Sequence, residues 1–204
     1  MPGSCTQNCG VLQAAGKLDE VARDWKFLPD SFHSEGMEAL LQLHILVGFP
    51  RTINALAAVQ EVGVKGDSSW SQEQVSDADK IRSRGEEACA AVYGGKYVKL
   101  RARMAALHPL LDVYMVEHAY GRVIARESSL SLRMRELCII SVLVGQEVAP
   151  QLASHIFGAL NVGATEEEIR TVIQQSDLVW GNEAHSKAED VLRSLHLENK
   201  RSKL

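Results

Sequence analysis

The sequence lacks features that would assign it to the membrane or nucleic-acid-binding proteins. Its apolar runs, such as Leu137–Val144, are far shorter than the roughly 20 residues that a bilayer-spanning helix needs. No stretch is rich in lysine and arginine, and 22 basic against 26 acidic residues give a net charge of −4. A chain with this charge balance has no basic surface of the kind that binds the phosphates of nucleic acid. We therefore expect neither a membrane nor a nucleic-acid partner.

Cysteine is scarce as well. The 204 residues include four cysteines, Cys5, Cys9, Cys89 and Cys138, which are too few and too scattered for a disulfide framework. The first residues also lack the charged start and the apolar stretch of a secretory signal. These absences favour a reducing compartment with free thiols. With 46% hydrophobic and 24% charged residues, the composition is that of a globular protein with a core of its own.

The sequence closes with the tripeptide Ser202-Lys203-Leu204. A terminal Ser-Lys-Leu is the address that the peroxisomal import receptor reads. We therefore expect localisation in the peroxisomal matrix, with the import receptor as a partner.

Helical periodicity dominates the rest of the sequence. Glycine and proline separate the periodic segments, and no run of β-branched residues alternates as a strand would. The predicted helices cover residues 11–25, 31–47, 50–62, 71–93, 97–107, 109–126, 130–145, 150–160 and 166–195. Capping-box patterns at Ser71-x-x-Gln74 and Thr165-x-x-Glu168 mark two helix starts. Connections this short make antiparallel neighbours, so we expect an all-α bundle.

Two segments of the chain are weakly similar to each other in sequence. Residues 41–59 can be laid over residues 174–192. Each segment places a helix before a glycine, Gly48 or Gly181, and an alanine-containing helix after it. Few residues are identical between the two segments, so this similarity indicates a repeat only together with other evidence.

A known pattern begins at Arg84. Its parts are Arg84-Gly85-Glu86 with Tyr93-Gly94 and Tyr97-Val98, VEHAYGRVIAR (116–126), RELCIISVLVG (135–145) and LASHIFGALNVGATEEEI (152–169). Together they resemble the carboxymuconolactone decarboxylase family, whose wider superfamily includes the AhpD-type alkylhydroperoxidases. The resemblance implies an AhpD-like all-α bundle that is oligomeric, as a trimer or a hexamer.

The resemblance also suggests how the chain is divided. Family members typically have a Gly-x-Pro break near the end, and here Gly181 keeps the glycine without the proline, whereas Gly48-Phe49-Pro50 has the full break upstream. We therefore expect an N-terminal tail and helix (1–30), a partial repeat resembling the end of a family domain (31–66), a family-like domain (71–197) and the targeting signal (201–204).

Glu136 and His155 are the first candidates for catalysis. They lie on consecutive predicted helices that a short turn near Gly145 joins, so antiparallel packing can bring them face to face. A carboxylate beside an imidazole makes a proton-transfer unit, because the acid orients the ring and histidine titrates near neutral pH. Alternatively, Glu136 complements the helix dipole and His155 is a core histidine. The family resemblance favours catalysis, since both positions belong to its active-site pattern.

Glu117 is a third candidate. Glu117 and His118 diverge by about 100° on a helix, so only one of them can face a shared pocket, and the family pattern has an acid at Glu117. An interhelical salt bridge is the alternative role. Arg122 and Arg126 are candidates for binding a substrate carboxylate, although such arginines more commonly form ion pairs with acidic side chains at the surface.

The cysteines argue against the peroxidase branch of the superfamily, which has a Cys-x-x-Cys just before the equivalent of His155. Val148 and Gln151 stand at those two positions, so a disulfide-cycling peroxidase would lose its central step. Cys138 is a redox candidate whose alternative role is that of a small buried hydrophobe. Cys5 and Cys9 can oxidise but lack thioredoxin-like spacing.

The motifs of metal and nucleotide sites are absent from the sequence. It contains no HExxH, no paired CxxC and no nucleotide-binding glycine loop, so we expect neither a metal nor a cofactor. The sequence and the resemblance predict a cofactor-free, decarboxylase-like lyase. It would resemble γ-carboxymuconolactone decarboxylase and act on a small carboxylated lactone or related acid. The alternatives are an AhpD-like thiol peroxidase or antioxidant protein and a non-catalytic oligomeric binding module.

Overall fold

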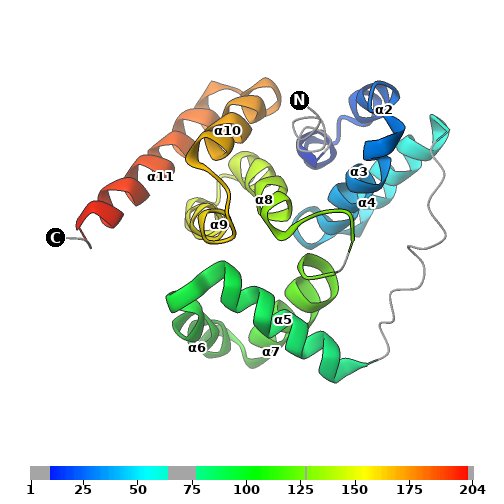
Figure 1. Ribbon diagram of the computed structural model, residues 1–204. Helices are drawn as coiled ribbons and strands as arrows, with labels where there is room; N and C mark the ends of the chain where they lie inside the picture. The colour runs from blue at the N-terminus through cyan, green and yellow to red at the C-terminus, as the bar shows by residue number, and fades with distance from the viewer. Residues whose placement is uncertain (1–9, 64–76, 127, 202–204) are drawn as a thin grey trace. The chain divides into compact units, whose positions relative to one another are not determined.

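The computed structural model describes residues 10–63, 77–126 and 128–201. These residues form helices and short connections and contain no β-strand, which confirms the predicted all-α fold (Figure 1). No helix among them is long and apolar enough to cross a membrane. The chain divides into two compact units. The first combines the described residues up to 63 with those from 129 onward, and the second contains those from 77 to 128.

The first unit is built around one buried helix. It comprises a helical stretch at residues 10–15, α2 (Leu18–Lys26), the short 3₁₀ helix η1 (Asp30–Phe32), α3 (His33–Gln42), α4 (His44–Glu61), α8 (Leu132–Gln146), α9 (Ala149–Asn161), α10 (Glu166–Trp180) and α11 (Asn182–Arg201). Helix α8 packs against α9, α10 and α11 and also against α3 (Figure 1). It is buried without interruption from Arg135 to Val144, because helices cover it on several sides.

Local sequence signals set the helix ends in this unit. Ser131 caps α8 by accepting a hydrogen bond from the backbone N–H of Met134 at 3.3 Å. The predicted capping box at Thr165 and Glu168 is confirmed, with each side chain accepting from the other residue's backbone N–H. The bond from Thr165 and the contact with Arg133 hold the pKa of Glu168 below its ordinary value.

The second unit is a smaller helical assembly. It contains α5 (Ala78–Tyr93), η3 (Gly94–Lys96), α6 (Tyr97–Leu107), α7 (Pro109–Val113) and η4 (Tyr114–Ile124). Helix η4 is a π-helix, a form with bonds from residue i to i+5, and the bond from Ala125 N–H to the Tyr120 carbonyl at 2.7 Å has this spacing. Helices α5 and η4 pack closely along their lengths.

Several predicted helix boundaries are wrong. The helix predicted at 11–25 is interrupted at Gly16, whose φ of 75° lies in the left-handed region, and the one predicted at 31–47 is divided into η1, α3 and the start of α4. The segment predicted as one helix at 109–126 changes from α to π at Tyr114. Residues 166–195 form two helices because Gly181 adopts φ 83°.

Other predictions fall partly or wholly outside the described residues. Helix α5 begins at Ala78, where Asp77 accepts hydrogen bonds from two backbone N–H groups, and the predicted start at Ser71 is outside the described part of the chain. The same is true of Cys5, Cys9 and the targeting tripeptide 202–204. By contrast, the helix predicted at 97–107 is confirmed as α6.

Candidate functional site

Two of the predicted catalytic residues meet in the first unit. Glu136 projects from the buried part of α8 and His155 from α9, and the Oε2 atom of Glu136 lies 2.8 Å from Nδ1 of His155. The glutamate side chain is fully buried, whereas 15% of the histidine side chain is exposed. The pair therefore joins a carboxylate removed from water to an imidazole that solvent can reach at one edge.

The second carboxylate oxygen of Glu136 has a distinct environment. Oε1 is buried and has no hydrogen-bond partner among the described residues. Buried polar atoms in folded proteins are nearly always hydrogen-bonded, to protein groups, to ordered water or to a bound molecule. Oε1 is thus an acceptor that a proton or a bound molecule can satisfy.

A charged cluster that we did not anticipate anchors α8 next to this pair. Arg135, which directly precedes Glu136, is fully buried and donates to Oε2 of Glu38 on α3 at 2.9 Å. It also donates to the side chain of Gln42 at 3.2 Å, and Gln42 donates in turn to the Arg135 carbonyl at 3.3 Å. The available sequence signal is the i, i+4 spacing of Glu38 and Gln42, which flank the apolar residues 39–41. This cluster fixes the helical turn that carries Glu136.

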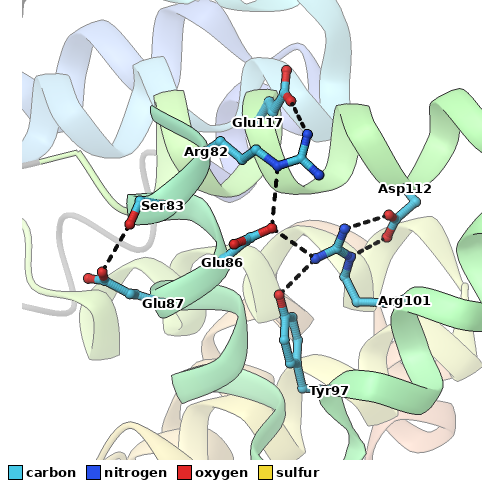
Figure 2. A network of polar contacts seen from close by, with 8 residues as sticks. All are labelled: Arg82, Ser83, Glu86, Glu87, Tyr97, Arg101, Asp112 and Glu117. Atoms are coloured by element: carbon cyan, nitrogen blue, oxygen red, sulfur yellow. Dashed lines mark hydrogen bonds and ion pairs between the residues drawn. The ribbon is translucent and has the colours of Figure 1, made fainter. Parts of the chain in front are cut away.

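Glu117 lies in the second unit and has an ion-pair partner there. Its carboxylate is 3.4 Å from Nη1 of Arg82 on α5, and 37% of its side chain is exposed. The contact agrees with the interhelical salt bridge considered as the alternative role (Figure 2). Arg122 lies on the exposed surface of η4 and Arg126 is half-buried just beyond it. The structure therefore brings Glu136 and His155 together, while Glu117 and the two arginines belong to the other unit.

The ion pair of Glu117 belongs to a larger network that the sequence did not reveal. Arg82 also contacts Glu86, which reaches Arg101 on α6 (Figure 2). Arg101 makes a bidentate contact of 2.6 and 2.7 Å with Asp112 and donates to Tyr97 at 2.9 Å. The hydrogen bonds with Asp112 raise the pKa of Arg101 above its ordinary value. The network ties α5, α6, α7 and η4 into one unit.

The described residues offer little support for metal or thiol chemistry. No group of three or more histidine, cysteine, aspartate or glutamate side chains that could hold a metal ion occurs among them. Cys138 is fully buried, and burial raises the pKa of its thiol to about 12. Because the thiolate is the reactive form, this environment suits a packing role for Cys138.

Comparison with known proteins identifies the family. The model of the carboxymuconolactone decarboxylase family matches residues 110–193. Peroxisomal protein 2 of Schizosaccharomyces pombe is 32% identical over 157 residues, which cover 75% of this chain and 72% of that protein. The chain belongs to the carboxymuconolactone decarboxylase family. A protein of the same name from Saccharomyces cerevisiae is 28% identical over 160 residues, covering 66% of this chain and 56% of that protein.

Membership of the carboxymuconolactone decarboxylase family accounts for part of the site. The matched region contains Glu117, Glu136 and His155, so all three predicted catalytic residues lie within it. Helices α2 to α4 lie outside it, although Glu38 and Gln42 contact α8. The names of the two relatives confirm the predicted peroxisomal localisation.

Proposed function

We propose that this protein is a cofactor-free lyase that releases CO₂ from a small carboxylated lactone or a related acid. The observation that carries the proposal is the 2.8 Å contact between His155 Nδ1 and the fully buried carboxylate of Glu136. Both residues lie in the first unit, whereas Glu117 and the two candidate arginines lie in the second. The proposal therefore rests on this pair alone. Family membership supports it at the level of a general role.

The pair is suited to deliver a proton after decarboxylation. When the bond between the substrate and its carboxylate carbon breaks, CO₂ leaves and the electron pair passes into the conjugated lactone carbonyl, which forms a dienolate. Because Nδ1 faces Glu136, Nε2 is the nitrogen that can give a proton to the dienolate carbon. The imidazole then regains its proton from water. No external electron acceptor is needed, since the conjugated carbonyl takes the electron pair.

Glu136 has two parts in this scheme. By accepting from Nδ1–H it fixes the orientation and tautomer of the ring, and its charge stabilises the imidazolium form that donates the proton. A general acid such as His155 contributes roughly 10²–10⁴-fold to a rate.

The rival proposal, a thiol peroxidase, is less well supported, because the thiol of Cys138 is buried and its pKa is raised to about 12.

The experiment is an assay of CO₂ release by the purified protein with a panel of carboxylated lactones. We expect His155→Ala to lower kcat by about 10²–10⁴-fold, while His118→Ala, at an exposed histidine of η4, retains the wild-type rate. Glu136→Gln should lower kcat more than it changes KM. Circular dichroism verifies that each variant is folded. Wild-type protein without CO₂ release, or an unimpaired His155→Ala, would refute the proposal.

We also propose that the protein forms a homo-oligomer. The second unit exposes large apolar side chains on and beside α6 and α7, at Val98, Leu107, Leu110, Leu111 and Tyr114. Helix α6 buries none of its residues against the described helices of its own unit. An apolar surface of this kind is typical of protein interfaces. Sedimentation velocity of the purified protein measures the assembly, and a monomer at all concentrations would contradict it.

A further inference from the structure

The first unit contains a cavity of about 260 Å³ that is separate from the Glu136–His155 pair. It lies among the end of α8, the beginning of α9 and the middle of α11. Leu143, Val144 and Leu152 form an apolar part of its lining and are almost completely buried. Neither Glu136 nor His155 lines it.

Two alanines on α11 explain why side chains do not fill this space. Ala184 and Ala188 both line the cavity and are separated by one helical turn, so their methyl groups face the same side. One turn further along, Leu192 occupies the equivalent position and is buried. At this turn its larger side chain fills the space that the two alanines leave open at theirs. The small side chains of the two alanines leave unfilled the volume that larger residues would take.

Charged groups surround the mouth of the cavity. The ammonium group of Lys187 is 2.6 Å from Glu147 and 2.9 Å from Glu183. These two contacts raise the pKa of Lys187 above its ordinary value, so the lysine is a cation already bound by two acids. Asp190, a further lining residue, pairs with Arg193 at 3.1 Å. The mouth therefore carries an excess of negative charge, which disfavours an anionic ligand.

We propose that this cavity binds an uncharged, mainly apolar small molecule, such as a substituted six-membered ring. A cavity of roughly 150 Å³ lined by aliphatic side chains is sufficient for benzene. The larger volume here has room for a ring with one short substituent. The aliphatic lining provides no partner for a buried charge, whereas a hydroxyl group at the mouth meets charged side chains with which it can form hydrogen bonds. This site is independent of the proposed lyase reaction.

The test is a titration of the full-length, ¹⁵N-labelled protein with benzyl alcohol and, separately, with benzoate. We expect benzyl alcohol to shift the backbone amide signals of Val144, Leu152 and Ala188 in a saturable manner. Benzoate has the same ring with a negative charge, so it should bind about tenfold more weakly at low ionic strength. Salt should reduce this difference, because it screens charges at an exposed mouth.

Three variants make the result specific. Ala188→Leu fills the cavity and should weaken benzyl alcohol binding by at least tenfold. Ala149→Phe narrows it from an exposed lining position, which keeps the test decisive if the first variant does not fold. Ala57→Leu, at an exposed alanine of α4 that does not line the cavity, is the matched control and should bind as the wild type does. The proposal is overturned if benzoate binds as well as benzyl alcohol, if no saturable shifts occur, or if the folded cavity variants bind normally.

Discussion

The thiol of Cys138 lies two residues after Glu136 on α8, in the part of the helix that is buried without interruption. Burial is the main reason why its pKa rises to about 12, and the nearby positive charge of Arg135 only partly opposes the effect. At neutral pH the group is therefore a thiol, which is a weak nucleophile. At this position, the environment of the residue determines its chemistry more than its residue type does.

We predict that Cys138 does not react in the folded protein. In a Cys5→Ser/Cys9→Ser variant the remaining thiols, Cys89 and Cys138, are both buried. A chromogenic disulfide reagent at pH 8 should label neither of them before unfolding and both of them in denaturant. The denatured sample is the control for the reagent. Rapid labelling of Cys138 in the native protein would instead support the thiol peroxidase.

A contact between two side chains was predictable from the sequence where the residues lie on helices that follow each other in the chain. Glu136 and His155 lie on consecutive helices joined by a short turn, so their meeting follows from antiparallel packing. The partner of Glu117 was not predictable in this way. Arg82 belongs to α5, which packs against η4 but is separated from it by α6 and α7 in the chain. One of several available arginines becomes the partner only when the helices are packed.

At the scale of whole helices, the backbones of α5 and η4 approach each other closely in the second unit. A Cβ atom added to Gly85 would collide with the backbone carbonyl of Val116, and one added to Gly121 would collide with the carbonyl of Ile81. Arg84 donates to the Gly121 carbonyl through Nε at 2.8 Å and through Nη2 at 2.6 Å. The absence of side chains at both glycines allows the two backbones to approach this closely.

We expect Gly121→Ala to destabilise the second unit by about 1–3 kcal/mol, in the range of overpacked core substitutions. The added methyl group meets backbone atoms, which cannot move aside as a flexible side chain could. Gly95→Ala is the control, since no atom lies within 4 Å of the added group. Hydrogen exchange of α5 and η4 amides measures the effect. Equal exchange in the two variants would show that the crossing tolerates a side chain.

Helix boundaries were predicted less well than helix positions, for a physical reason. The break predicted at Gly48 is real. Gly181, which lies inside the helix predicted at 166–195, divides that helix and adopts nearly the same conformation as Gly48, with φ/ψ of 83°/168° against 77°/164°. This likeness supports the proposed partial repeat. The break at Gly16 was missed, because glycine permits positive φ without requiring it and tertiary packing selects which glycines use it. The change to a π-helix in η4 had no recognised sequence signal.

At the scale of the molecule, the N-terminal segment belongs to the same compact unit as α8 to α11. Leu46 and Val47, which precede the Gly48 bend, and Trp180, which precedes the Gly181 bend, pack against one apolar cluster that contains Val142 of α8. Residues far apart in the sequence thus share a core. The sequence predicts a partial repeat here, but the polar contacts that attach this segment to α8 depend on the three-dimensional packing.

The buried contact between Glu38 and Arg135 provides the test of this attachment. Removing one member of a buried ion pair leaves an uncompensated charge and costs about 3–5 kcal/mol, whereas replacing both members by apolar residues is often neutral. We therefore expect Glu38→Leu to destabilise the first unit strongly. Glu38→Leu/Arg135→Met should recover much of that loss, because no buried charge remains.

Urea unfolding followed by tryptophan fluorescence measures this difference in the first unit. In a Trp70→Phe background the remaining tryptophans are Trp25 and Trp180, which both belong to that unit. Glu183→Leu removes a largely exposed acid that pairs with Lys187 and is the matched control, since surface pairs contribute little to stability. If Glu38→Leu unfolds at the same urea concentration as this control, the contact does not attach the N-terminal segment to α8. If it unfolds earlier and the double variant does not recover, the loss has a cause other than an unpaired Arg135.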